Sequence, residues 1–215
     1  MSTTIYLIRH GESEANMHDV FLGHHNMDLT QIGRKQARMT ADYLKNQVCQ
    51  ADVIYSSDLV RAYETAKCTA ECFDIPIIKD ENLREIDAGY WDNVKFDDLA
   101  NKYADSFGTW CNNIGLARCD GGESVEELQR RIVSAVTRIA RKHKDSVVFL
   151  FTHATPVRAF AAHCLMKSLE DMKDVPWAAN ASITKVVYDN DTFELVEYSY
   201  DSFMGHLTTR LPANV

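Results

Sequence analysis

Short apolar segments alternate with longer amphipathic segments along this chain of 215 residues. Ile5 to Ile8, Val53 to Tyr55 and Val147 to Phe151 are continuous apolar runs of strand length, as expected of strands buried on both faces. Amphipathic segments of helical length lie between them. This alternation is typical of a three-layer α/β/α sandwich, in which a mostly parallel central sheet carries helices on both faces. We therefore predict an α/β fold.

Four predicted helices begin with residue types that cap helix N-termini, namely Thr30, Asp58, Ser124 and Thr155. Ser124 opens a capping box with a glutamate three residues later, and Thr155 is followed by a proline that fits the first helical position. The first three helices are expected to end near residues 48, 73 and 143. Residues 183–188 and 193–198 are expected to form a closing hairpin.

The residue pattern of 92–120 differs from that of the rest of the chain, because aromatic residues recur there at helical spacing with little strand signal. We interpret them as a small helical cap inserted in a single domain that spans 1–215. Apolar residues at this spacing are what any docked helix needs, so packing is the expected role and substrate contact is the alternative. The segment carries five aspartates against three basic residues, which disfavours a multiply phosphorylated substrate.

Charge and composition exclude several classes of function. The net charge of −8 would repel DNA or RNA, so no nucleic-acid partner is expected. No apolar run approaches the roughly 20 residues of a membrane span, and the first residues lack the features of a signal peptide. The six cysteines are scattered, as is usual for reduced thiols. A cytoplasmic protein without a membrane partner is expected.

Polar residues that suit phosphate chemistry follow the predicted strands. Arg9 and His10 end the first strand, Arg61 follows the second, and His153 follows the strand that ends at Phe151. The carboxyl ends of parallel strands meet at the edge where α/β sheets bind ligands. Guanidinium groups match the oxygens of a tetrahedral anion, and a neutral imidazole can attack phosphorus. A phosphate site is therefore predicted there.

Six blocks of residues, spread in order over nearly the whole chain, form a recognisable set of motifs. They are Leu7 to Ser13 with Asn16, Leu29 to Ala37, Ser56 to Ala66, Leu83 to Trp91, Gly121 to Ser124, and Thr152-His153 with Arg158-Ala159 and Asn180 to Ile183. In these blocks and their order the chain resembles the histidine phosphatase superfamily, in its phosphoglycerate-mutase-like branch.

The resemblance implies roles for individual residues. His10 would attack phosphorus and become phosphohistidine, while Arg9, Arg61 and His153 hold the phosphoryl oxygens. Glu85 would give a proton to the leaving oxygen and then activate water. Positioning and charge stabilisation suffice for a loose phosphoryl transition state, so no metal and no cofactor are implied.

Four further positions match residues that line the phosphate or substrate pocket in relatives: Ser13, Asn16, Gly23 and Ala154. Ser13 and Asn16 have an alternative role as caps of a short helix after the catalytic loop. Relatives usually have glycine where this chain has Ala154, which brings a methyl group to the pocket. Glu12 is expected to orient local structure.

Other histidines have weaker interpretations. A metal site among His18, His24, His25 and Asp28 is the alternative to surface or entrance lining, but their spacing fits no two-histidine helical motif. His206, near the end of the chain, could fold over the pocket.

The resemblance implies a metal-independent phosphatase that acts on a small-molecule phosphoester. Mutases of the family have a longer segment with a basic cluster before the Gly-Gly-Glu-Ser block, whereas here that segment is short and net acidic. Mutase-type phosphoryl transfer stays an alternative, and so does a noncatalytic phosphate-binding regulatory module. The closing hairpin offers an edge strand through which a homodimer could form.

Overall fold

The structure, a computed structural model, describes residues 2–48 and 50–211 of the chain. Its centre is a six-stranded sheet in the order β4-β3-β6-β1-β7-β8. The strands are β1 (Thr3–Arg9), β3 (Val53–Ser56), β4 (Ile77–Lys79), β6 (Val147–Thr152), β7 (Ile183–Asp189) and β8 (Thr192–Tyr200). Strands β4, β3, β6 and β1 are mutually parallel, and the β7–β8 hairpin adds two antiparallel strands. The predicted mostly parallel sheet is confirmed.

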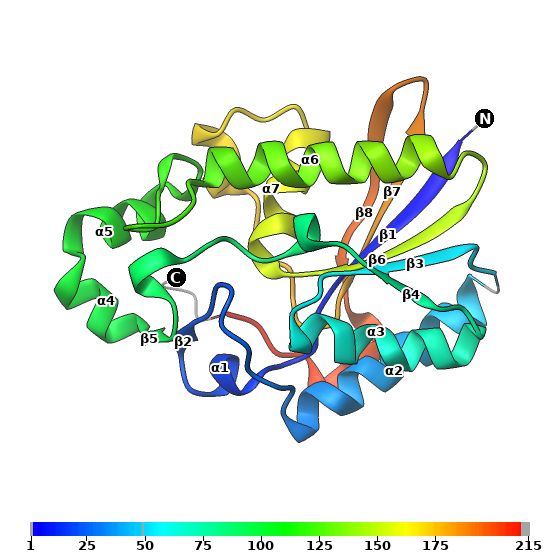
Figure 1. Ribbon diagram of the computed structural model, residues 1–215, viewed down its shortest axis with the longest axis horizontal. Helices are drawn as coiled ribbons and strands as arrows, with labels where there is room; N and C mark the ends of the chain where they lie inside the picture. The colour runs from blue at the N-terminus through cyan, green and yellow to red at the C-terminus, as the bar shows by residue number, and fades with distance from the viewer. Residues whose placement is uncertain (1, 49, 212–215) are drawn as a thin grey trace.

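Helices cover both faces of the sheet, as predicted (Figure 1). Helices α2 (Gln31–Gln47) and α3 (Val60–Phe73) lie on one face, and α6 (Val125–Lys142) and α7 (Ala154–Cys164) on the other. The shorter helices are α1 (Glu14–Met17), α4 (Phe96–Lys102) and α5 (Ala104–Asn112), with 3-10 helices η1 (Glu81–Leu83), η2 (Gly89–Trp91), η3 (Ile114–Leu116), η4 (Glu170–Asp174) and η5 (Ser202–Leu207). No helix in the described residues is long and apolar enough to cross a membrane.

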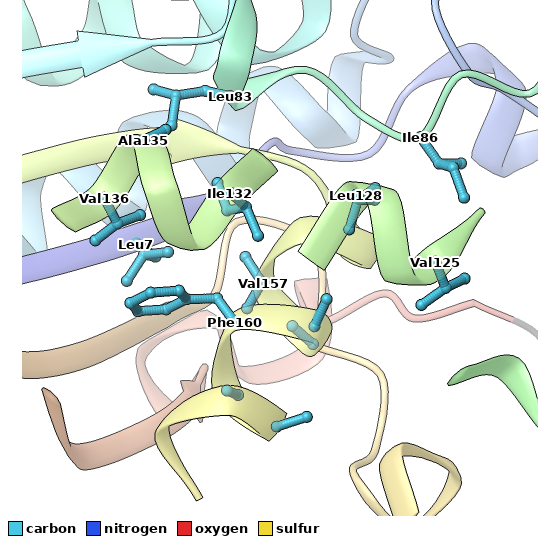
Figure 2. Packing of buried hydrophobic residues seen from close by; sticks show 14 of the residues in the cluster. Leu7, Leu83, Ile86, Val125, Leu128, Ile132, Ala135, Val136, Val157 and Phe160 are labelled. Carbon is cyan, nitrogen blue, oxygen red and sulfur yellow. The ribbon is translucent and has the colours of Figure 1, made fainter. Parts of the chain in front are cut away.

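The alternation of side chains along each strand divides the core into two layers. Leu7 of β1 packs in the cluster that includes α6 and α7, whereas its neighbour Ile8 packs with α2 and α3. Figure 2 shows Ile132 of α6 and Val157 and Phe160 of α7 in the first of these layers, close to Leu7. Because both faces are covered, the central parallel strands β1, β3 and β6 are largely apolar and carry polar groups mainly at their ends, whereas the hairpin strands β7 and β8 also have charged residues in their interiors.

Two of the four predicted helix caps are confirmed and two are wrong. Thr30 and Ser124 each accept a backbone N–H of the first turn, and Ser124 forms the predicted capping box. Asp58 does not cap α3, which begins after Leu59, because the Asp58 carboxylate is bound by Arg84 instead. Helix α7 begins after His153, so Thr155 lies inside its first turn. The following proline is tolerated there because first-turn N–H groups have no helical acceptor.

Residues 92–120 fold as a helical segment at one end of the sheet (Figure 1). A two-residue strand, β5 (Val94–Lys95), pairs with β2 (Val20–Phe21) and ties the segment to the loop after α1. Phe107 and Trp110 of α5 are buried against Trp91, and Phe96 of α4 stacks on Phe107. The predicted packing role of the aromatic stripe is therefore confirmed.

Candidate active site

The predicted site residues converge at the carboxyl edge of the parallel strands. Arg9 is the last residue of β1, His153 follows β6, Arg61 lies in the first turn of α3 after β3, and Glu85 lies in the loop after β4. Arg9, Arg61 and Glu85 line a pocket with about 460 Å³ of empty space, part of it open to solvent, whereas the fully buried His153 is not among its lining residues. The pocket is lined by Arg9, His10, Ser13, Asn16, Val20, Phe21, Leu22, Arg61, Glu85, Phe96, Trp110, Ala154, Thr155, Trp177 and Leu211.

His10 is buried in a tautomer that suits a nucleophile. Its Nδ1 lies 2.7 Å from the carbonyl oxygen of Gly11, an atom that can only accept, so Nδ1 carries the proton and Nε2 the lone pair. Burial, followed by the charges of Arg61 and Arg9, holds the pKa of His10 well below its usual value. The imidazole is therefore neutral at physiological pH.

Two buried guanidiniums supply the positive charge of the site. Arg61 donates to the carbonyl oxygens of Gly23 (2.8 Å) and His25 (3.1 Å), and Arg9 donates to that of Ala178 (2.6 Å). Burial lowers the pKa of each to about 10, so both remain charged at neutral pH. The Nε of Arg9 is buried without a hydrogen-bond partner in the described structure. These carbonyls fix the guanidiniums but cannot neutralise them, which leaves a concentrated positive potential for an anion.

His153 is fully buried beside His10 and does not itself line the pocket. Its ring lies 5.1 Å from that of His10, centroid to centroid, and its Nε2 is 2.9 Å from the hydroxyl of Ser57. Its Nδ1 is buried with no partner in the described structure. Burial first, and then the charge of Arg61, lowers the pKa of His153 well below its usual value. Both imidazoles of the site are thus neutral without a ligand.

Glu85 is held by backbone donors in the pocket wall. The residue is 7% exposed, and its two carboxyl oxygens accept the N–H groups of Ile86 (2.8 Å) and Thr155 (3.3 Å). Arg131 donates to the Glu85 carbonyl at 3.1 Å and pairs with Glu123 at 2.8 Å. The sequence motif contains Glu123 but does not indicate that Arg131 links it to Glu85. An arginine on a helix carries no sequence signal of a partner far along the chain.

Of the four further positions expected to line the pocket, three do so. Ser13 caps α1 in a capping box with Asn16, and both residues also line the pocket, so the two alternatives are compatible. Ala154 lines the pocket as the first residue of α7. Gly23 does not line it, but its carbonyl binds Arg61. Glu12 accepts the hydroxyl proton of Thr30 at 2.7 Å, which agrees with the predicted local role.

Several other sequence-based alternatives can be compared with the geometry. Within residues 2–48 and 50–211, no group of three histidine, cysteine or acidic side chains is arranged to hold a metal ion. His206 is exposed and does not line the pocket. Trp177 and Leu211 do line it, and nothing in their local sequence indicated this.

Comparison with known proteins agrees with this geometry. The model of the histidine phosphatase superfamily (branch 1) matches residues 5–201. Phosphoserine phosphatase 1 of Hydrogenobacter thermophilus is 33% identical over 155 residues, which are 72% of this chain and 72% of that protein. The metal-independent phosphoserine phosphatase of Arabidopsis thaliana is 33% identical over 159 residues, 73% of this chain and 66% of that protein. The solved structure of Bacillus stearothermophilus YhfR superposes with a TM-score of 0.89 at 29% identity, covering 94% of this chain and 99% of that one. This chain belongs to the histidine phosphatase superfamily, branch 1.

Proposed function

We propose that this protein is a phosphatase that hydrolyses a small phosphomonoester through a phosphohistidine on His10, without a metal ion. Membership of the family and relatives named as phosphatases support the activity class, a phosphoric monoester hydrolase. The observation that carries the assignment of residues is the neutral His10 between two buried guanidiniums, with its Nδ1 proton held by a carbonyl oxygen. A nucleophile is useful only when its lone pair faces the electrophile, and this arrangement keeps that lone pair on Nε2.

In the first step, Nε2 of His10 forms a bond to phosphorus while the bond from phosphorus to the ester oxygen breaks. Arg9 and Arg61 stabilise the charge on the remaining phosphoryl oxygens, and His153 donates a hydrogen bond to one of them. The departing oxygen takes its proton from Glu85, whose carboxyl lies in the same pocket. The products of this step are a free alcohol and phosphohistidine.

In the second step, water attacks the phosphohistidine. Glu85, now ionised, takes a proton from that water, and the bond between Nε2 and phosphorus breaks to release inorganic phosphate. The backbone donors of Ile86 and Thr155 occupy one lone pair on each carboxyl oxygen and leave another available for the proton. Two arginines and neutral imidazoles supply the field that a metal provides in other phosphatases, so no cofactor is needed.

The test is phosphate release from phosphomonoesters in EDTA, combined with rapid acid or base quenching of a ³²P-labelled substrate. We expect base-stable, acid-labile label on the wild-type protein and none on His10→Ala, with turnover lost in that variant. A matched His206→Ala control, at an exposed position outside the pocket, should keep full activity. Full activity in His10→Ala would refute the mechanism. Label transferred to a second hydroxyl of the substrate would indicate a mutase, and binding without turnover would indicate a regulatory module.

We also propose a single domain over 1–215 in which residues 92–120 form a cap, located in the cytoplasm and without a nucleic-acid partner. The burial of the cap's aromatic side chains in the main core supports one folding unit. The net charge of −8 disfavours nucleic acid, and the cysteines within the described residues are free thiols. A homodimer would form through β8, whose outer side is an edge of the six-stranded sheet.

A further inference from the structure

The part of the pocket that receives the leaving group is apolar and largely aromatic. It is formed by Phe21 and Leu22 beside α1, Phe96 and Trp110 of the cap, Trp177, and Leu211. The four aromatic rings are contiguous, because Phe21 contacts both Phe96 and Trp110, at 6.1 and 5.0 Å between centroids, and Trp110 stacks on Trp177 at 6.1 Å. A leaving group bound against these rings would lose contact with water and gain contact with aromatic carbon atoms on several sides, which favours an apolar group.

The charged side chains that line the pocket all belong to its phosphate end. Among the described lining residues, Arg9 and Arg61 are the cations and Glu85 is the anion. A phosphate dianion occupies both guanidiniums and leaves no cation for a second acidic group on the substrate. A carboxylate or ammonium on the leaving group would therefore lose its hydration against aromatic rings and gain no ionic partner there.

Arg158, a cation outside the pocket lining, does not change this conclusion. Arg158 lies against Trp177, with its guanidinium carbon 4.3 Å from the ring centroid. Its Nη2 donates to the carbonyl oxygens of Met172 and Lys173. Arg158 therefore supports Trp177 by a cation–π contact and is not part of the pocket lining.

We propose that the substrate is the phosphate monoester of an uncharged aromatic or bulky apolar alcohol. This inference rests on the proposed phosphatase function and specifies its substrate class. The phosphoserine and phosphoglycerate classes, which carry extra charges on the leaving group, fit this wall poorly.

The test compares kcat/KM for substrates whose leaving groups are all primary alcohols, so that differences in leaving-group basicity are small. Benzyl phosphate and 2-naphthylmethyl phosphate represent the apolar class, and phosphoserine and 2-aminoethyl phosphate the charged class. We expect the apolar substrates to be favoured by about a hundredfold, the scale on which a hydrophobic pocket discriminates several carbon atoms. Equal or better turnover of the charged substrates would overturn the proposal and leave the phosphatase function intact. Absence of turnover and of labelled His10 with every substrate would refute the proposed function itself.

Two pocket variants and one surface control test whether the apolar lining residues cause the preference for uncharged leaving groups. Leu211→Arg places a cation in the half-buried part of the pocket and should raise kcat/KM for 3-phosphoglycerate relative to benzyl phosphate by about tenfold. Ile78→Arg adds the same charge on the exposed β4 edge and should leave that ratio unchanged. Trp177→Ala should lower kcat/KM for 2-naphthylmethyl phosphate by about tenfold while phosphoserine changes little. Ratios that stay at the wild-type value in both pocket variants would overturn the proposal.

Discussion

The two buried histidines of the site should make the protein less stable in mild acid. Burial, together with the charge of Arg61, holds the pKa of both His10 and His153 well below 6.5 in the folded protein. In the unfolded chain both imidazoles return to an ordinary pKa of about 6.5 and bind protons below it. The unfolded state then binds more protons than the folded state. The free energy of unfolding therefore falls as pH drops through 6.5, and continues to fall until the lowered folded-state pKa is reached.

The size of the effect follows from this difference in proton binding. Between about pH 7 and pH 5.5, a group that titrates near 6.5 only in the unfolded chain changes the free energy of unfolding by about 1 kcal/mol. His10 and His153 together therefore account for about 2–3 kcal/mol, a large share of the roughly 5–15 kcal/mol that stabilises a typical domain.

Urea unfolding followed by circular dichroism, at these two pH values in buffer without phosphate, tests the argument. Phosphate is left out because an anion bound between the guanidiniums would favour protonated imidazole. On acidification, the free energy of unfolding of the double variant His10→Gln/His153→Gln should fall by about 2–3 kcal/mol less than that of wild type. The control His206→Gln, at an imidazole exposed to water before and after unfolding, should behave as wild type. An equal loss in the double variant and wild type would show that the buried imidazoles are not held neutral.

Three single substitutions test a close backbone approach, a helix cap and a buried hydrogen bond. Gly33→Ala would place a methyl group 2.0 Å from the carbonyl oxygen of Glu12, so urea unfolding should show a loss of about 3 kcal/mol; wild-type stability would contradict this close approach. Ser124→Ala removes the capping box of α6 and should cost about 1 kcal/mol in the same assay, with activity retained. Ser57→Ala leaves His153 Nε2 buried without its partner and should cost about 1–3 kcal/mol in calorimetry, unlike a surface serine.

The sequence predicted elements whose signals are local. Buried strands appear as continuous apolar runs, and the capping box at Ser124 is complete within four residues. The cap assigned to Asp58 failed because its carboxylate is bound by Arg84, which lies 26 residues further along the chain. His153 occupies the N-cap position of α7, which begins at Ala154 directly after it. Thr155, the residue that the sequence pattern assigned as the cap, therefore lies inside the helix. A local pattern cannot exclude a competing partner from another element.

Short strands were missed for a related reason. β4 has three residues, two of them exposed, and β2 and β5 have two residues each. Such segments show neither a continuous apolar run nor a full period of alternation. Their pairing is decided by the strands beside them, which a sequence pattern does not specify.

The same distinction separates the two ends of the pocket. The phosphate end could be predicted because its residues follow strands, and the ends of parallel strands meet at one edge. The apolar end includes Trp177 and Leu211, which lie outside any helix or strand pattern, whereas the helical spacing of Phe96 and Trp110 indicated packing as their expected role and pocket lining only as the alternative.

The cap residues also serve two purposes that periodicity cannot separate. Phe96 and Trp110 belong to the main core cluster and at the same time line the pocket. A large-to-small change at Trp110 would therefore cost about 3–5 kcal/mol of stability as well as altering the pocket. Trp177 and Leu211 are only partly buried, so they can change with a smaller loss of packing. Substitutions at Trp177 and Leu211 can therefore test the proposed substrate preference while the packing around Phe96 and Trp110 is preserved.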